Sequence, residues 1–326
     1  MKKLKIAVLV GGPSLEREVS FVTGKAIFDN LDRKKYTVSL VEMTKEGHFF
    51  VTENKVKKVI DFQNKDKNKF DLIFIAMHGT PGEDGTIQGM FEVLKIKYTG
   101  PNTLSSALCM NKIYSAQIYF ANGLPYPDFI NFKKDGWKNS KEKILDDVNK
   151  KIGYPAVIKP VDQGSAVGVS VVRNKEELKN TVDKTIKKFP WLIAQKFIKG
   201  QEATCGVIEI DGKLFPLPPT RILPRLGKFY DYKSKYKKGG STHICPADFS
   251  PEVNLAIQDL TLKAHIALGC RGMSRTDIFV GDDKKLYILE TNTIPGMTPT
   301  SLFPEAAAKA GIDFSRMLDL IIKSSL

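Results

Sequence analysis

A polar hairpin near the C-terminus constrains the fold more than any other stretch of the sequence. Two apolar runs, Ile278–Val280 and Leu286–Leu289, flank a Gly-Asp-Asp-Lys-Lys segment, which is the pattern of a β-hairpin. A turn centred on Asp283–Lys284 places Asp277 opposite Glu290. Two facing carboxylates at the ends of buried strands repel each other, so we expect a cation beside them.

The side chains around this hairpin predict a site for a hard divalent ion. Asp277, Glu290 and Asn292 supply oxygen ligands, which suit Mg²⁺ when it shares its shell with water and phosphates. Arg275 shares a strand face with Asp277, where a guanidinium can hold a phosphate or a developing oxyanion. The alternative is an ordinary hairpin with solvated acids at its edges.

A glycine-rich loop in the middle of the chain predicts phosphate binding. Lys159 ends an apolar strand, and Gly164 and Gly168 lie in the loop before the next strand, where backbone N–H groups can approach phosphate oxygens. A plain hairpin with a flexible tip is the competing interpretation. The sequence contains neither GxxxxGK[ST] nor GxGxxG, so the common P-loop and dinucleotide motifs are absent.

The first hundred residues alternate between strand and helix patterns and predict an α/β unit. Apolar strands at 6–10, 36–42 and 71–77 accompany a helix at 15–31 that Ser14 would cap. Glu16 and His78 follow strand ends, where α/β proteins bind ligands. Glu16 could instead only stabilise the helix dipole, and His78 could be a capping or core residue.

The composition limits the classes of partner. The net charge of +14 raises the question of nucleic-acid binding, but the lysines are mixed with acids and no nucleic-acid motif accompanies them. The apolar run in MKKLKIAVLVGG is too short for a signal peptide, and no run approaches the roughly 20 residues that cross a bilayer. Four scattered cysteines indicate free thiols. We therefore expect a cytoplasmic protein without nucleic-acid or membrane partners.

Several strings in the sequence resemble the D-alanine–D-alanine ligases of the ATP-grasp superfamily. They include HGTPGEDGTIQG at 78–89, the loop at 162–172, and RTD at 275–277 with LETNTIPGMT at 289–298. The resemblance runs in family order from Lys5 to about Leu320. It implies an α/β fold of the α+β three-domain ATP-grasp type, with a Rossmann-like parallel-sheet domain at 1–103, a central ATP-grasp domain at 104–193 and a C-terminal one at 194–326.

The resemblance also implies a reaction and a set of site residues. D-alanine would be phosphorylated by ATP and then attacked by a second D-alanine, giving D-alanyl-D-alanine, ADP and phosphate for peptidoglycan precursors, with two Mg²⁺ ions, or Mn²⁺ in their place. The implied catalytic residues are Glu16, Ser165, Tyr236, Arg275 and Gly296; the substrate-binding residues are Glu16, His78, Arg275, Gly296, Ser301 and Leu302; the ATP-binding residues are Lys112, Lys159, Ser165, Gln195, Lys196, Phe197, Ile198, Glu202, Lys235 and Asn292; and the metal ligands are Asp277, Glu290 and Asn292.

Two residues depart from the family's pattern, and some alternatives stay open. Gln195 replaces an acid that reads the adenine edge, and Ala166 replaces a serine of the phosphate loop. Tyr236, on a long segment expected to form a lid, favours an amine acceptor, although a ligase for D-lactate or D-serine, or a silent binding protein, are alternatives. The family suggests a homodimer. No side chain stands out as the base that deprotonates the second amine.

Overall fold

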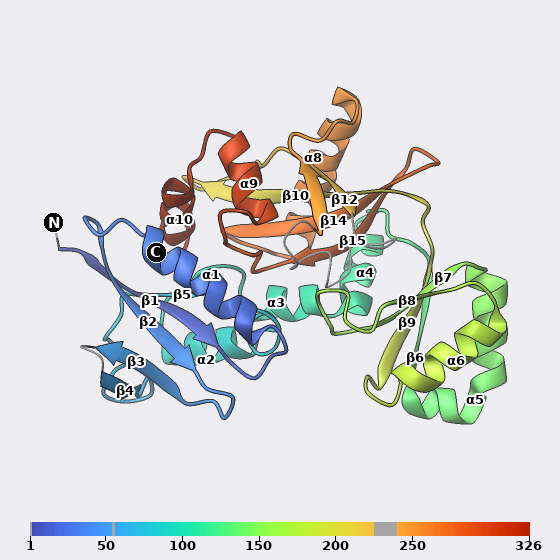
Figure 1. Cartoon of the computed structure of the whole chain (residues 1–326), viewed down its shortest axis with the longest axis horizontal. Coiled ribbons are helices and arrows are strands. Elements are labelled where there is room, and N and C mark those ends of the chain that lie inside the picture. Colours follow the sequence, from blue (N-terminus) through green and yellow to red (C-terminus); the bar gives the residue numbers. More distant parts are fainter. Residues whose placement is uncertain (1, 54–55, 225–239) are drawn as a thin grey trace.

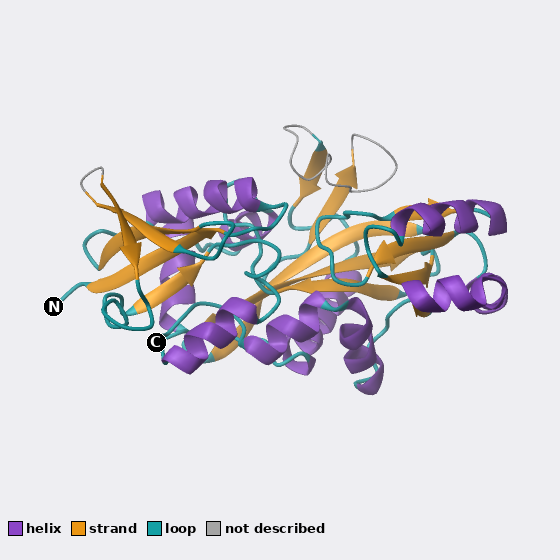
Figure 2. Ribbon diagram, turned by 90° about the horizontal axis from the view of Figure 1, so that it is seen from below, coloured by secondary structure: helices purple, strands orange, loops and turns teal. Residues whose placement is uncertain are grey.

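The computed structural model describes residues 2–53, 56–224 and 240–326, which form three β-sheets with helices packed around them (Figures 1 and 2). The predicted lid residues Lys235 and Tyr236 lie outside the described residues. No helix in the described ranges is long and apolar enough to cross a membrane.

The N-terminal sheet has the strand order β4-β3-β2-β1-β5. Its strands are β1 (Leu4–Gly11), β2 (Tyr36–Met43), β3 (Phe49–Glu53), β4 (Val56–Ile60) and β5 (Leu72–Ile75), with β1 parallel to both β2 and β5. The central strand β1 is apolar without alternation because both of its faces are covered. Val8 packs toward α1 (Arg17–Asn30) and α10 (Phe314–Lys323), whereas Leu9 packs on the side of α2 (Thr86–Leu94).

The central sheet is antiparallel and has the order β6-β9-β7-β8. It comprises β6 (Phe129–Lys133), β9 (Trp191–Lys196), β7 (Ala156–Pro160) and β8 (Ser170–Val172), with the helices α5 (Lys134–Asp147) and α6 (Lys175–Thr185) and the π-helix η1 (Val148–Ile152). These elements have a hydrophobic core of their own and form the green and yellow-green lobe of Figure 1.

The C-terminal sheet has the order β13-β12-β10-β14-β15, with β11 on β10. Its strands are β10 (Gly200–Ile210), β11 (Lys213–Pro216), β12 (Thr220–Pro224), β13 (Ser241–Ile244), β14 (Met273–Gly281) and β15 (Leu286–Asn292); α8 (Pro251–Ala267) and α9 (Leu302–Lys309) accompany them. Residues of α3 (Thr103–Met110) and α4 (Lys112–Ala121) share a core with this sheet. The predicted domain division stays a prediction, although its boundary at 193 falls inside β9.

Two local predictions of helix ends are wrong. The helical pattern of residues 105–122 predicts one helix, but the structure breaks it at Asn111. The Asn111 side chain accepts from the N–H groups of Ile113 and Tyr114 and thereby caps α4. Ser14 does not cap α1, because its Oγ accepts from the N–H of Glu16, at 3.0 Å, and the helix begins at Arg17.

The β14–β15 hairpin confirms the predicted pairing of Asp277 with Glu290 but not the predicted turn. The turn is centred on Asp283 alone, since the N–H of Gly281 bonds to the carbonyl of Lys285, at 2.8 Å. The register shifts between Ile278, which pairs with Ile288, and Asp277, which pairs with Glu290. Leu289 is therefore the extra residue in β15, and the predicted pairing holds from Asp277 onward. A bulge at this position re-aims the side chains that follow.

Candidate active site

Two cavities meet at the β14–β15 hairpin. The first, of about 300 Å³, lies between the central and C-terminal sheets and is lined by both Asp277 and Glu290. The second, of about 500 Å³, lies between the N-terminal unit and the same hairpin and is lined by Arg275 and Asn292. We call them the nucleotide cavity and the amino-acid cavity; both volumes fall in the range of about 300–1,000 Å³ that is usual for ligand sites.

The nucleotide cavity collects most of the predicted ATP-binding residues. Of the set expected from the sequence, it is lined by Lys112, Lys159, Gln195, Lys196, Phe197, Ile198 and Glu202, while Ser165 and Asn292 line the amino-acid cavity. The nucleotide-cavity residues come from α4, β7, β9, the β9–β10 connection and β10, so neither sheet alone forms the cavity.

The Asp277 carboxylate is the most heavily bonded group between the cavities. It is 4% exposed and accepts two hydrogen bonds from Arg275, both at 3.0 Å, and one from the Thr204 hydroxyl at 2.6 Å. The side-chain amide of Asn292 donates to it at 3.3 Å. A buried carboxylate needs such partners, because burial without them disfavours its charged form.

The second carboxylate of the hairpin is paired with a lysine. Lys112 Nζ lies 3.5 Å from Glu290 Oε2 and donates to the carbonyl of Gln163 at 2.6 Å. Within the described ranges no group of three or more His, Cys, Asp or Glu side chains is arranged to hold a metal ion. The donors that the structure does bring together here are two carboxylates and one amide, a set that fits Mg²⁺ only if phosphates and water complete the shell.

Lys159 has an unusual electrostatic position. Its side chain lines the nucleotide cavity and is only 7% exposed. Burial, together with the nearby charge of Lys112, lowers the pKa of Lys159 to about 7, although Glu290 opposes the shift. An anionic ligand in the cavity would restore its charge.

Gln195 carries an unmet hydrogen-bonding group. Its side chain is 3% exposed, and its Nε2 is fully buried without a well-aligned hydrogen-bond partner among the described residues, although the amide lies close enough to the Tyr126 hydroxyl to lower the pKa of that group against the effect of burial. Buried polar atoms of this kind are uncommon and point to a missing ligand. Ala166, the other departure from the family's pattern, also lines this cavity and adopts a left-handed φ of 56°.

Glu16 reaches the amino-acid cavity from the loop that joins β1 to α1. Its Oε1 accepts a hydrogen bond from the Ser165 hydroxyl of the glycine-rich loop between β7 and β8, so this contact joins two of the three sheet units. The β1–α1 loop requires glycine, since Gly11 has a φ of +94° and a Cβ there would lie 2.4 Å from the carbonyl oxygen of Met43.

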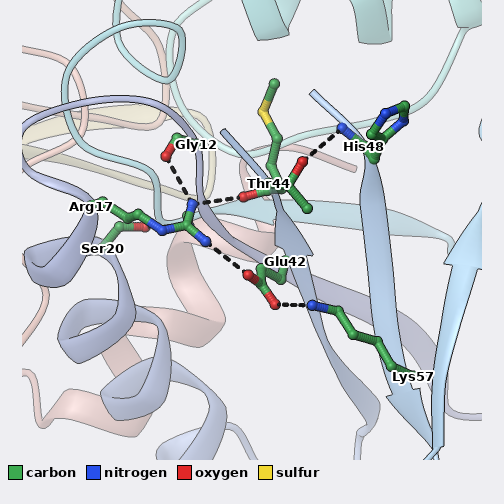
Figure 3. A network of polar contacts seen from close by, with 9 residues as sticks. Gly12, Arg17, Ser20, Glu42, Thr44, His48 and Lys57 are labelled. Atoms are coloured by element: carbon green, nitrogen blue, oxygen red, sulfur yellow. Dashed lines mark hydrogen bonds and ion pairs between the residues drawn. The ribbon is translucent and has the colours of Figure 1, made fainter. Parts of the chain in front are cut away.

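Arg17 clamps the same loop (Figure 3). Its guanidinium donates to the carbonyls of Gly12 and Met43, at 2.8 and 2.9 Å, and to the carboxylate of Glu42 at 2.7 Å. Lys57 binds the other oxygen of Glu42 at 2.9 Å. The network holds the start of α1, and therefore Glu16, against the end of β2.

His78 lies in the amino-acid cavity as predicted, but its ring is already bonded within the protein. Its Nε2 lies 2.9 Å from the Thr23 hydroxyl, and the ring also bonds to the backbone of Ile294. Burial lowers the pKa of His78, and Arg275 adds to that effect, whereas Glu16 opposes it. The neutral imidazole therefore shapes the cavity wall.

The predicted second-substrate residues lie together at the other end of the amino-acid cavity. Gly296 lies in the loop after β15, Ser301 is the N-cap residue of α9, and Leu302 is the first residue of that helix. Helix N-termini favour anions such as carboxylates.

Glu83 and His243 are among the lining residues of this cavity that the sequence-based prediction did not name as site residues. Glu83 sits in the glycine-punctuated HGTPGEDGTIQG string, so an acid inside a glycine-rich loop was the available signal. His243 forms a hydrogen bond with Glu305, with 2.8 Å between Nδ1 and Oε2. No local sequence pattern relates His243 to Glu305, because only the tertiary fold brings β13 next to α9.

Comparisons with known proteins decide the family. The family model described as "D-ala D-ala ligase N-terminus" matches residues 5–101, and the one described as "D-ala D-ala ligase C-terminus" matches residues 118–323. This chain belongs to the D-alanine–D-alanine ligase family. The predicted family, ligase class and ATP-grasp fold are thereby confirmed.

Individual relatives agree with this assignment over the whole chain. A D-alanine–D-alanine ligase of Syntrophobacter fumaroxidans (strain DSM 10017 / MPOB) is 42% identical over 328 residues, which cover 100% of this chain and 98% of that protein. Among solved structures, the VanG D-Ala:D-Ser ligase from Enterococcus faecalis superposes with a TM-score of 0.88 at 31% identity, covering 100% of both chains. The ATP complex of the D-alanine–D-alanine ligase from Bacillus anthracis has a TM-score of 0.78 at 32% identity and covers 99% of this chain and 97% of that one.

Proposed function

We propose that this protein joins two D-alanine molecules into D-alanyl-D-alanine, with conversion of ATP to ADP and phosphate. One observation carries the proposal beyond family membership: a nucleotide cavity and an amino-acid cavity meet at the β14–β15 hairpin, which lends Asp277 and Glu290 to one and Arg275 and Asn292 to the other. A γ-phosphate in the first cavity can therefore meet a carboxylate in the second.

Binding of ATP follows from the groups in the nucleotide cavity. Lys112 and Lys159 supply positive charge for the phosphates, and the buried amide of Gln195 bonds to the adenine edge. Glu202 binds the ribose hydroxyls. Mg²⁺, held by Asp277, Glu290 and Asn292, would neutralise phosphate charge during transfer.

The first D-alanine binds through its ammonium at Glu16, beside Ser165, so that its carboxylate faces the hairpin. Attack of this carboxylate on the γ-phosphorus gives an acyl phosphate and ADP. The second D-alanine, with its carboxylate at Ser301 and Leu302, attacks the acyl carbon, and Arg275 and the Gly296 N–H stabilise the oxyanion. We further propose that the enzyme is a cytoplasmic homodimer and that its product enters peptidoglycan precursors.

The first experiment measures ADP release by the purified protein with ATP and Mg²⁺. We expect ADP and a dipeptide of the mass of D-alanyl-D-alanine with D-alanine, and no ADP with L-alanine. D-Lactate and D-serine, added in competition with D-alanine, test the alternative acceptors.

A pair of variants serves as the control for this assay. Asp277→Asn should abolish ADP release, whereas Asp248→Asn, which weakens an ion pair with Arg221 outside both cavities, should retain it. Absence of ADP with every amino acid, or a mixed product dominated by D-lactate or D-serine, would contradict the proposed reaction.

A further inference from the structure

The proposed reaction requires a base in the amino-acid cavity. An amino acid in neutral water carries an ammonium group, which has no lone pair with which to attack an acyl phosphate. Its proton must therefore pass to another group before or during the attack. The described side chains of the cavity that could accept it are histidines and carboxylates: Glu16, Glu18, His78, Glu83 and His243.

The two histidines are committed to other partners. His78 is bonded to Thr23 and to the backbone of Ile294, in a buried position that disfavours its protonated form. His243 is bonded through Nδ1 to Glu305 and through Nε2 to Ser241, at 2.8 and 3.1 Å. Neither ring keeps a nitrogen without a partner for the incoming amine.

The three glutamates differ in their surroundings. Glu18 is exposed to solvent in the first turn of α1. Glu16 accepts from Ser165 and is assigned to the first ammonium. Glu83 uses Oε2 to accept from the N–H of Gly79, at 2.6 Å. Its Oε1 accepts no hydrogen bond from the described residues, and Glu83 lines the cavity.

We propose that Glu83 is the catalytic base that takes the proton from the ammonium group of the second D-alanine. In this step an N–H bond of the ammonium breaks and an O–H bond forms at Glu83 Oε1. The freed lone pair of the nitrogen bonds to the acyl carbon, and phosphate leaves with the electrons of the C–O bond. The departing phosphate takes the second proton that the nitrogen loses as it becomes the amide. The proton passes from Glu83 to solvent when the dipeptide leaves. The inference rests on the proposed function and extends it.

The charges around Glu83 suit this role. Burial and the neighbouring Glu16 raise the pKa of Glu83 to about 8; Glu290 acts in the same direction, and the Gly79 N–H and Arg275 oppose it. His78, the other titratable group nearby, is kept neutral. A base with a pKa near the working pH holds a proton well enough to remove it from an ammonium and still releases it to water.

Glu83→Gln tests the proposal, because the glutamine oxygen can still accept from Gly79 while the side chain can no longer take a proton. Hydroxylamine replaces the second D-alanine in a parallel assay, since it is largely unprotonated at neutral pH and needs no base. We expect Glu83→Gln to slow dipeptide formation by about a hundredfold or more, and to form D-alanine hydroxamate within about twofold of the unsubstituted rate. Residual dipeptide synthesis should rise about tenfold per pH unit as free amine accumulates.

Three further variants complete the design. Glu83→Asp keeps a carboxylate and should recover part of the dipeptide rate. Glu92→Gln, on α2 and outside the cavity, should leave both rates unchanged, since its oxygen still accepts from Tyr98 and Thr103. His243→Gln should not separate the two reactions.

The outcomes separate the inference from the function on which it rests. An equal loss of dipeptide and hydroxamate in Glu83→Gln overturns the base role, as does an unchanged dipeptide rate or a separation seen in His243→Gln instead. If the unsubstituted protein makes neither product, the proposed function itself fails.

Discussion

At the scale of single residues, the site depends on ionisable side chains that are buried, where desolvation disfavours their charged forms. Lys159 is buried beside another lysine, Lys112, and both effects lower its pKa to about 7. Asp277 is buried as well, but Arg275 binds both of its oxygens. Lys159 therefore lacks a nearby negative charge strong enough to offset its burial, and the phosphates of ATP would provide one.

The shifted pKa of Lys159 predicts a pH dependence of ATP affinity. Above a pH of about 7 the free protein must take up a proton when phosphates restore the charge of Lys159, so affinity should fall with rising pH, by up to about tenfold per unit. Titration calorimetry from about pH 7.5 to about pH 9.5 measures this slope. In Lys159→Arg, which stays charged, the affinity should be nearly flat over the same range; equal slopes in both proteins would contradict the assignment.

At the scale of elements, the last helix is joined to the first unit by a buried carboxylate. Asp319 of α10 is 2% exposed and accepts from the hydroxyl of Tyr36, at 2.6 Å, and from Lys35, both at the start of β2. Burial raises the pKa of Asp319, but these two donors outweigh it and hold the pKa below its usual value. Residues 283 positions or more apart in the sequence thus form one polar contact.

Removal of this carboxylate should loosen α10. Asp319→Ala leaves the Tyr36 hydroxyl buried without its acceptor, so we expect unfolding in urea to require about 1–3 kcal/mol less free energy. The matched variant Asp29→Ala removes an exposed ion pair with Lys25 within α1 and should cost at most about 0.5 kcal/mol.

The same contact should make stability fall in acid. Because the pKa of Asp319 is lower in the folded than in the unfolded chain, its contribution is present above the unfolded value and lost as the pH falls through the folded one. Equal urea midpoints for Asp319→Ala and Asp29→Ala would show that the contact of Asp319 does not stabilise α10.

At the scale of the whole molecule, the three sheets do not have three separate cores. One hydrophobic cluster joins Val8 and Phe74 of the N-terminal sheet to Phe303 of α9 and Leu318 of α10. The central sheet keeps its own cluster and forms a separate lobe in Figure 1. It reaches the rest through contacts such as Ser165 with Glu16. The central unit is therefore the part that can open locally at the smallest cost in buried apolar area.

Hydrogen exchange with a non-hydrolysable ATP analogue tests this division. We expect the analogue to slow exchange in β7, β9 and the start of α4, which line the nucleotide cavity, and to leave β2 to β4 unchanged. Uniform slowing across the chain, or slowing confined to the N-terminal sheet, would argue against a separately opening central unit.

Local patterns were sufficient for the parts of the site that one or two neighbouring elements build. The hairpin pattern placed Asp277 opposite Glu290, and the strand–loop–strand pattern placed Lys159 before a phosphate loop, because side-chain alternation and turn chemistry act over a few residues. The same reasoning placed the centre of the turn between Asp283 and Lys284 instead of on Asp283. The cause is a bulge in β15, which shifts the strand register and has no signature in the sequence. This reasoning also missed the break at Asn111, where one side chain caps a new helix.

The sequence by itself determined the family, the order of the elements and the chemical types of the site residues. Only the tertiary structure decided which of them share a cavity, that Glu83 lines the amino-acid cavity, and that α10 completes the core of the first unit. The physical reason is range: hydrogen bonds within turns and helices depend on near neighbours, whereas burial and the pKa shifts of Lys159 and Glu83 depend on groups that only folding brings together.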